Sequence, residues 1–121
     1  MPNEPPAKFP GRLPNGEYAI LSKAKICDYL LSSTHPIGRF KAAFFSALGY
    51  TIDNWERLRE DLLELARSGE AFGGRASPYG QTYEVHGTLV GPSGRRADLL
   101  TVWIVRSGTM YPQFVTAYPG E

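Results

Sequence analysis

The sequence contains few of the side chains that form cross-links or hold metal ions. Among 121 residues there are one cysteine, Cys27, and two histidines. A single cysteine cannot form an internal disulfide, and no Cys-x-x-Cys spacing is present for zinc. A structural zinc site is therefore excluded, and we expect no cofactor.

Long apolar runs and a large excess of one charge are also absent. No apolar run approaches the roughly 18 residues needed to span a bilayer, and the segment from Met1 to Pro14 lacks the basic-then-apolar pattern of a secretion signal. We therefore expect no membrane partner. The net charge of +1 excludes the strong global field of a protein that coats DNA.

The composition is that of an ordinary folded domain with a proline-rich start. Hydrophobic residues make up 42% and charged residues 21% of the chain, and a chain of this length suits one core. The early prolines are Pro2, Pro5, Pro6, Pro10 and Pro14. Because proline disfavours helix and sheet interiors, we predict a tail or linker over residues 1–16 and a single domain over residues 17–121.

Helical signals fill the first half of this domain. Ser22 is a suitable N-cap for a helix over residues 23–31. Pro36 suits the first position of a second helix, which we expect to end at Leu48 before the C-capping Gly49.

A third helix is predicted to start at a capping box made by Asp53 and Glu56 and to end near Gly69. Its apolar stripe is Trp55, Leu58, Leu62 and Leu65.

The second half changes to the alternating pattern of strands. We predict strands over residues 82–89, 97–106 and 114–118, with a possible fourth over 70–72. The expected fold class is α+β, with about three N-terminal helices packed on a C-terminal antiparallel sheet of three to four strands.

The start of the second helix is a candidate phosphate-binding corner. His35 and Arg39 are one helical turn apart, Lys41 follows, and Gly38 adds no side chain that would block an approaching ligand. The alternative is that His35 only caps the helix while Arg39 and Lys41 are solvated surface charges.

The sheet offers hydroxyls and aromatic rings that could line one surface. Thr101 and Trp103 share a face of the central strand, and Thr116 and Tyr118 lie on the last strand. Simple packing is the alternative, because threonine and aromatic residues are favoured in any strand.

Several short motifs occur together between residues 17 and 119. They are Tyr29-Leu30-Leu31, His35-Pro36-x-Gly38-Arg39-x-Lys41-Ala42, Leu48-Gly49-Tyr50, Asn54-Trp55-Glu56, Thr101-x-Trp103-Ile104-Val105-Arg106 and Val115-Thr116-Ala117-Tyr118-Pro119. In this combination the chain resembles a bacterial domain family of unknown function. The resemblance implies a module found at the C-termini of secreted polymorphic toxins or as a small protein encoded beside a partner.

The closing motif from Val115 to Pro119 is also similar to the ends of metal-free ribonuclease toxins of the barnase, EndoU and colicin-like fold group. That resemblance implies a metal-independent ribonuclease that cleaves RNA, with tRNA as an expected substrate, and leaves a cyclic phosphate. It implies action in the cytoplasm, after delivery as the end of a secreted toxin, and a cognate immunity protein or antitoxin as partner.

On this hypothesis each candidate residue has a role. His35 is the acid or base, Arg39 and Lys41 stabilise the phosphate, and Thr116 and Tyr118 orient groups or relay a proton. The expected substrate-binding residues are Tyr83, Trp103 and Thr101, with the two rings stacking a base.

The second hypothesis is a non-catalytic binding module that pairs with a neighbour-encoded protein. In that case the same sheet face is a protein interface, with Trp103 and Tyr118 as its anchors.

Overall fold

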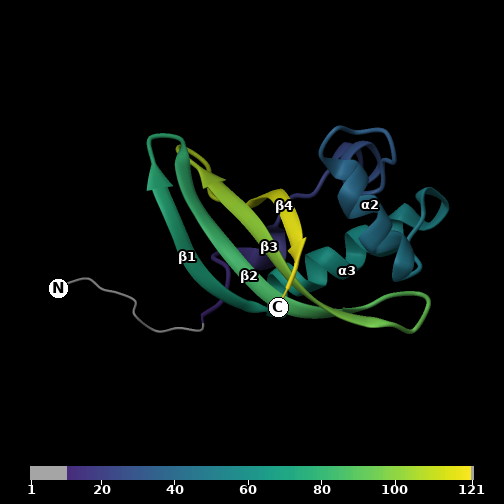
Figure 1. Cartoon of the computed structure of the whole chain (residues 1–121). Coiled ribbons are helices and arrows are strands. Elements are labelled where there is room, and N and C mark those ends of the chain that lie inside the picture. Colours follow the sequence, from purple (N-terminus) through teal and green to yellow (C-terminus); the bar gives the residue numbers. More distant parts are fainter. Residues whose placement is uncertain (1–10, 121) are drawn as a thin grey trace.

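The structure, a computed structural model, describes residues 11–120. Helices come first and a four-stranded antiparallel sheet in the order β1-β2-β3-β4 comes last (Figure 1), so the predicted α+β fold is confirmed. The helical elements are η1 (Gly16–Tyr18), α1 (Lys23–Lys25), η2 (Ile26–Leu30), α2 (Gly38–Ala47), η3 (Ile52–Asn54) and α3 (Trp55–Ser68). The strands are β1 (Glu70–Ser77), β2 (Gly80–Val90), β3 (Arg96–Arg106) and β4 (Gln113–Pro119).

The first helix begins as the sequence predicts and then widens. The Ser22 hydroxyl accepts a hydrogen bond from the backbone N–H of Lys25 at 3.2 Å, as an N-cap does. After α1 the chain continues as the π-helical turn η2, which the N–H of Leu31 closes on the carbonyl of Ile26 at 2.8 Å.

The other two helices start at different residues from those predicted. Helix α2 begins at Gly38 rather than Pro36. The capping box before α3 is made by Thr51 and Asn54, around the short turn η3, and not by Asp53 with Glu56.

Part of the segment expected to be a tail packs against the domain. Gly11 exchanges backbone hydrogen bonds with Ala71 of β1, at 3.2 and 3.0 Å, and Leu13 is buried in the core. Residues 11–16 are therefore held by the fold, whereas residues 1–10 of the expected tail lie outside the described residues. No helix between residues 11 and 120 has the length and apolarity to cross a membrane.

A β-bulge in β4 decides which side chains face which side of the sheet. Phe114 lies opposite Trp103 and Thr116 lies opposite Val102, so β4 has one extra residue, Val115, at this point. Since residues directly opposite one another share a face, Thr116 lies on the other face from Phe114. We expected Thr101 and Trp103 of β3 to line one surface with Thr116 and Tyr118. The bulge puts the two pairs on opposite faces of the sheet.

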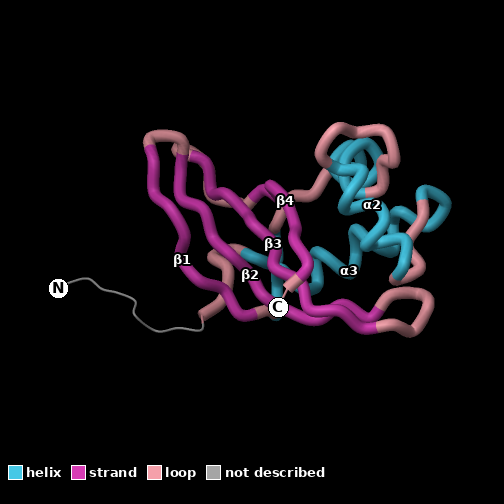
Figure 2. Tube along the Cα trace, in the orientation of Figure 1, coloured by secondary structure: helices cyan, strands magenta, loops and turns pink. Residues whose placement is uncertain are grey.

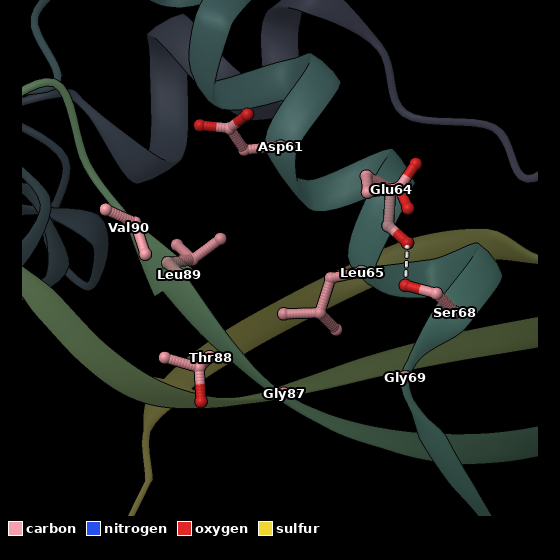
Figure 3. A pocket seen from close by; sticks show the side chains of 9 residues that line it. All are labelled: Asp61, Glu64, Leu65, Ser68, Gly69, Gly87, Thr88, Leu89 and Val90. Atoms are coloured by element: carbon pink, nitrogen blue, oxygen red, sulfur yellow. Dashed lines mark hydrogen bonds between the residues drawn. The ribbon is translucent and has the colours of Figure 1, made fainter.

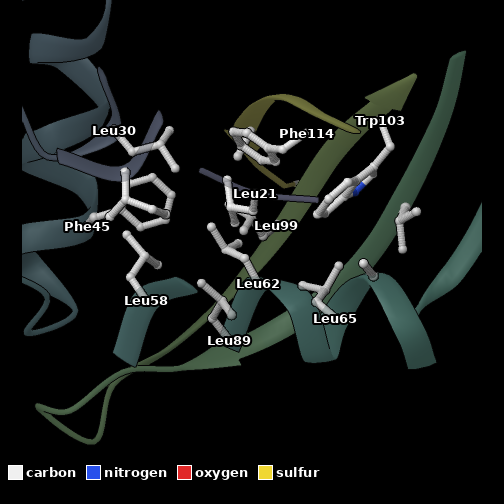
Figure 4. Close-up of a cluster of buried hydrophobic side chains, with 14 of the residues drawn as sticks. Leu21, Leu30, Phe45, Leu58, Leu62, Leu65, Leu89, Leu99, Trp103 and Phe114 are labelled. Carbon is white, nitrogen blue, oxygen red and sulfur yellow. The ribbon is translucent and has the colours of Figure 1, made fainter. Parts of the chain in front are cut away.

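The core lies between the sheet and the helices, which gather on the β4 side (Figure 2). Leucines of α3 pack against side chains of β2 and β3, and Phe45 of α2 and Leu30 of η2 extend the cluster (Figure 4). Trp103 is fully buried, and its indole N–H donates to the Thr101 hydroxyl at 2.8 Å. That hydroxyl donates to the Val85 carbonyl at 3.0 Å, so these buried polar groups are satisfied.

We expect Trp103→Ala to lower the free energy of unfolding by about 4 kcal/mol, because it removes the largest fully buried side chain and leaves a cavity. Tyr79→Ala is the control; this ring is 75% exposed, and its loss should change stability by no more than about 0.5 kcal/mol. Chemical denaturation measures both. Unchanged stability of Trp103→Ala together with weaker RNA binding would instead indicate a stacking surface.

Candidate functional site

A cleft of about 780 Å³ lies where the first two helices meet strand β4. The side chains that could bind or react with a ligand in it are Lys25, Asp28, Tyr29, His35, Thr116 and Tyr118. Three separate segments supply these residues, namely α1 with η2, the connector before α2, and β4. The fold therefore brings together groups that are far apart in the sequence.

The floor of the cleft carries a pair of hydroxyls. The Tyr29 hydroxyl and the Thr116 hydroxyl are 2.8 Å apart, and either can be the donor. Thr116 reaches this position because the bulge at Val115 turns it away from the core. Two hydroxyls in contact can pass a proton or orient a bound oxygen.

His35 caps the start of α2 through one nitrogen and keeps the other free. Its Nδ1 accepts hydrogen bonds from the backbone N–H groups of Ile37 and Gly38, both at 3.0 Å. An acceptor at Nδ1 places the proton of the neutral ring on Nε2, which has no hydrogen-bond partner among residues 11–120. The ring stands edge-on to Tyr29, with 5.1 Å between ring centroids.

Gly38 is what allows α2 to start so close to the cleft. A Cβ atom at this position would overlap the carbonyl oxygen of Tyr29. The close approach of α2 to η2 sets His35 beside Tyr29. In the motif His35-Pro36-x-Gly38, His35 therefore caps the helix, and Gly38 is needed because no side chain fits there.

Lys41 reaches strand β4 from α2. Its Nζ donates to the Ala117 carbonyl at 2.8 Å and lies 4.1 Å from the centroid of the Tyr118 ring. Partial burial lowers the pKa of the Lys41 ammonium from its ordinary value. Lys41 thus lies beside Tyr118, whereas His35, Thr116 and Tyr118 line the cleft together.

Arg39 lies apart from this group. Its guanidinium donates to the Pro36 carbonyl at 2.9 Å, is 4.5 Å from the Phe40 ring centroid and lines a different groove, with Leu31 and Tyr50. The expected placement of Arg39 beside Lys41 at one phosphate is therefore not seen in this structure.

The three residues expected to bind substrate lie elsewhere. Trp103 and Thr101 are both fully buried and bonded to each other in the core, so neither offers a surface to a base. Tyr83 is half-buried on β2, opposite Trp103, and packs against the same core. The physical reason is that their faces of β2 and β3 are covered by helices.

Three cleft residues were missed in the sequence. Lys25, Asp28 and Tyr29 all belong to the first helical segment, and Lys25 and Tyr29 are one turn apart. The Lys25 ammonium lies 5.0 Å from the Tyr29 ring centroid. This i, i+4 spacing of a cation and a ring was the available signal.

A second cleft, of about 410 Å³, separates α3 from β2 (Figure 3) and has a different chemistry. Its charged groups are Asp61 and Glu64. Asp61 accepts from Arg57 at 3.1 Å and from the Tyr50 hydroxyl at 2.6 Å, and Glu64 is paired with Arg67. Burial and the bond to Asp61 raise the pKa of Tyr50. Among the residues that the structure describes, no lysine, arginine or histidine lines this cleft, whereas Lys25 and His35 line the cleft at β4, which is therefore the better candidate for binding an anion.

Between residues 11 and 120, the His, Cys, Asp and Glu side chains form no group of three or more that could hold a metal ion.

The helix-first order, the four-stranded sheet and the cleft define an α+β domain with a mixed cation and hydroxyl site at one sheet edge. The chain belongs to the family described as a domain of unknown function, DUF6883, whose model matches residues 12–121. No curated protein matches the sequence.

A similar solved structure is a chain of a contact-dependent growth inhibition toxin–immunity protein complex from Klebsiella pneumoniae 342. The likeness has a TM-score of 0.66 and 18% identity, and it covers 83% of this chain and 98% of that chain. At this level of identity the likeness shows a common fold.

Proposed function

We propose that this domain is a metal-independent ribonuclease that acts as a toxin. The observation that carries the proposal is the cleft at β4, where an imidazole, paired hydroxyls, a carboxylate and the Lys25 amine line one space. The Lys41 amine lies beside it, at the Ala117 carbonyl and the Tyr118 ring. Cleavage of RNA through a cyclic phosphate needs a proton acceptor, a proton donor and cations beside the phosphate. We assign Asp28 as the proton acceptor, the His35 Nε2–H as a hydrogen-bond donor, water as the proton donor, and Lys25 and Lys41 as the cations.

In the proposed reaction the ribose 2′-oxygen forms a bond to phosphorus while the bond from phosphorus to the 5′-oxygen breaks. The 2′-hydroxyl proton passes to a base, for which Asp28 supplies a carboxylate in the cleft. The departing 5′-oxygen takes up a proton from a water molecule, and the hydroxide that is left is neutralised by the proton held on Asp28. The products are a 2′,3′-cyclic phosphate and a 5′-hydroxyl.

Because His35 caps α2 through Nδ1, it can take only one of the two catalytic roles expected of it. Because Nδ1 accepts two backbone N–H bonds, a proton added there would face two donors. We therefore assign His35 as a hydrogen-bond donor, through Nε2–H, to a phosphate oxygen or the leaving oxygen, and not as the base. The hydroxyls of Tyr29 and Thr116 orient the ribose, and Lys41 stabilises the charge that develops on the phosphate.

The toxin part of the proposal is supported by the fold shared with a chain of a toxin–immunity protein complex. On this proposal the domain acts in the cytoplasm of a target cell on RNA, tRNA included. It is then neutralised in the producing cell by an immunity protein or antitoxin.

The test is incubation of the purified protein with total bacterial RNA in EDTA. We expect discrete cleavage by the wild type and a rate at least about 100-fold lower for Asp28→Asn, which removes the base. Asp53→Asn, an exposed aspartate away from the cleft, is the matched control and should cleave normally. Intact RNA after incubation with the wild type would contradict the proposal.

A non-catalytic binding module is the second candidate, favoured by the sheet face on the side opposite the core. Leu100, Val102 and Ile104 of β3 lie on this face and are only half-buried. An apolar strip of this kind suits a protein interface. Expression without a partner separates the candidates, since a ribonuclease should stop growth whereas a binding module should not.

A further inference from the structure

Two lysines from different helices reach the same edge of the sheet. Lys25 of α1 donates from Nζ to the Val115 carbonyl at 3.0 Å, and Lys41 of α2 donates to the Ala117 carbonyl at 2.8 Å. Val115 and Ala117 are the residues on either side of Thr116. The two ammonium groups are therefore anchored at neighbouring outward-facing carbonyls of one strand, two residues apart. In a regular strand such carbonyls lie roughly 7 Å apart.

Each of the two ammonium groups also lies over a tyrosine ring. Lys25 is 5.0 Å from the Tyr29 ring centroid, and Lys41 is 4.1 Å from that of Tyr118. A lysine ammonium has three N–H donors, of which the carbonyl uses one. Each ammonium group is thus fixed in place and keeps two N–H donors for a ligand. Because the side chain is already ordered before a ligand binds, much of the entropic cost of binding is avoided.

We propose that Lys25 and Lys41 bind two consecutive phosphates of one unpaired RNA strand, with Thr116 facing the ribose between them. The inference rests on the proposed ribonuclease and names its substrate as a strand that must present two phosphates. Two cations anchored two residues apart on one strand suit a repeating chain of phosphates better than a single anion. The rings of Tyr29 and Tyr118 beside the two amines give bases a surface for stacking.

The simpler role for both lysines is to protect the exposed edge of β4, where charged side chains commonly block pairing with another chain. That role predicts a stability effect and no effect on the salt dependence of RNA binding. The two roles are therefore separable by measurement.

The experiment measures binding of a short, non-self-complementary 2′-O-methyl RNA oligonucleotide by fluorescence anisotropy over a series of salt concentrations. The methyl group blocks the attacking oxygen, so binding is measured without cleavage. We expect Lys25→Ala and Lys41→Ala each to reduce the slope of log K against log salt by about 0.7, and the double variant by about 1.4.

Lys23→Ala is the matched control, because Lys23 lies two residues from Lys25 and its Nζ is 5.2 Å from the Trp55 ring centroid. It should leave the slope unchanged, as should Lys25→Arg, which keeps both the charge and a donor for the strand edge. Thermal melting of each variant shows whether it is folded.

If the Lys25→Ala variant is folded and shows the same salt slope as the Lys23→Ala variant, the inference is wrong. Parallel incubation with unmodified RNA separates this result from failure of the enzyme. If the wild type cleaves RNA but the lysine variants keep its salt slope, the ribonuclease proposal stands and the two-phosphate site is wrong. If the slope changes but the wild type does not cleave RNA, the site stands and the ribonuclease proposal is wrong.

Discussion

His35→Asn is expected to lower the rate of RNA cleavage at least about 100-fold while leaving the fold intact. Asparagine can accept a hydrogen bond from the start of α2, as the Nδ1 atom of His35 does for Ile37 and Gly38, but its shorter amide cannot place an N–H at the position of Nε2–H. Cleavage rates on a defined RNA, together with thermal melting, measure the two effects separately.

His35→Ala extends this comparison because it removes both the cap and the donor. It should lose the same activity and, in addition, about 1 kcal/mol of stability. If His35→Asn cleaved at the wild-type rate while His35→Ala was only less stable, His35 would be a helix cap and the chemistry would have to lie elsewhere.

Gly38→Ala is expected to disturb the cleft more than any exposed substitution. The added Cβ would overlap the Tyr29 carbonyl oxygen, which is backbone and cannot rotate away. Helix α2 must then move from η2, at a cost of about 3 kcal/mol, and His35 moves with it. We expect a large drop in melting temperature and loss of RNA cleavage.

Gly94→Ala is the control for this steric argument. Gly94 has a φ of +87° in an exposed turn, and a Cβ there meets nothing within 4 Å. Its cost is backbone strain alone, about 1 kcal/mol, and cleavage should be unaffected. Equal stability losses for the two glycine variants would contradict the close packing of α2 on η2.

Local signals in the sequence predicted the fold class well. The alternation in β2 placed Val85 and Leu89 on the buried face and Glu84 and His86 on the exposed one, as observed. The hydrophobic stripe of α3 was equally clear, because Leu58, Leu62 and Leu65 repeat at helical spacing and are all buried. Each pattern depends on neighbours within one element.

The candidate site was only partly predictable, because its arrangement depends on contacts between elements. The bulge at Val115 moves Thr116 to the opposite face of the sheet. Residues 113–117 contain no glycine, the residue that would have indicated a bulge in the sequence. The central position of β3 buries Trp103, although the same residue would be exposed on an edge strand. Lys25 and Tyr29 gain significance only when η2 lies against β4.

The ends of the RNA fragments test the central claim most directly. After incubation of total bacterial RNA with the wild type in EDTA, we expect 2′,3′-cyclic phosphates at the 3′ ends of the fragments and hydroxyls at their 5′ ends. These ends arise only when the neighbouring 2′-oxygen is the nucleophile. Fragments with 5′-phosphates and 3′-hydroxyls, or RNA that stays intact, would contradict the account.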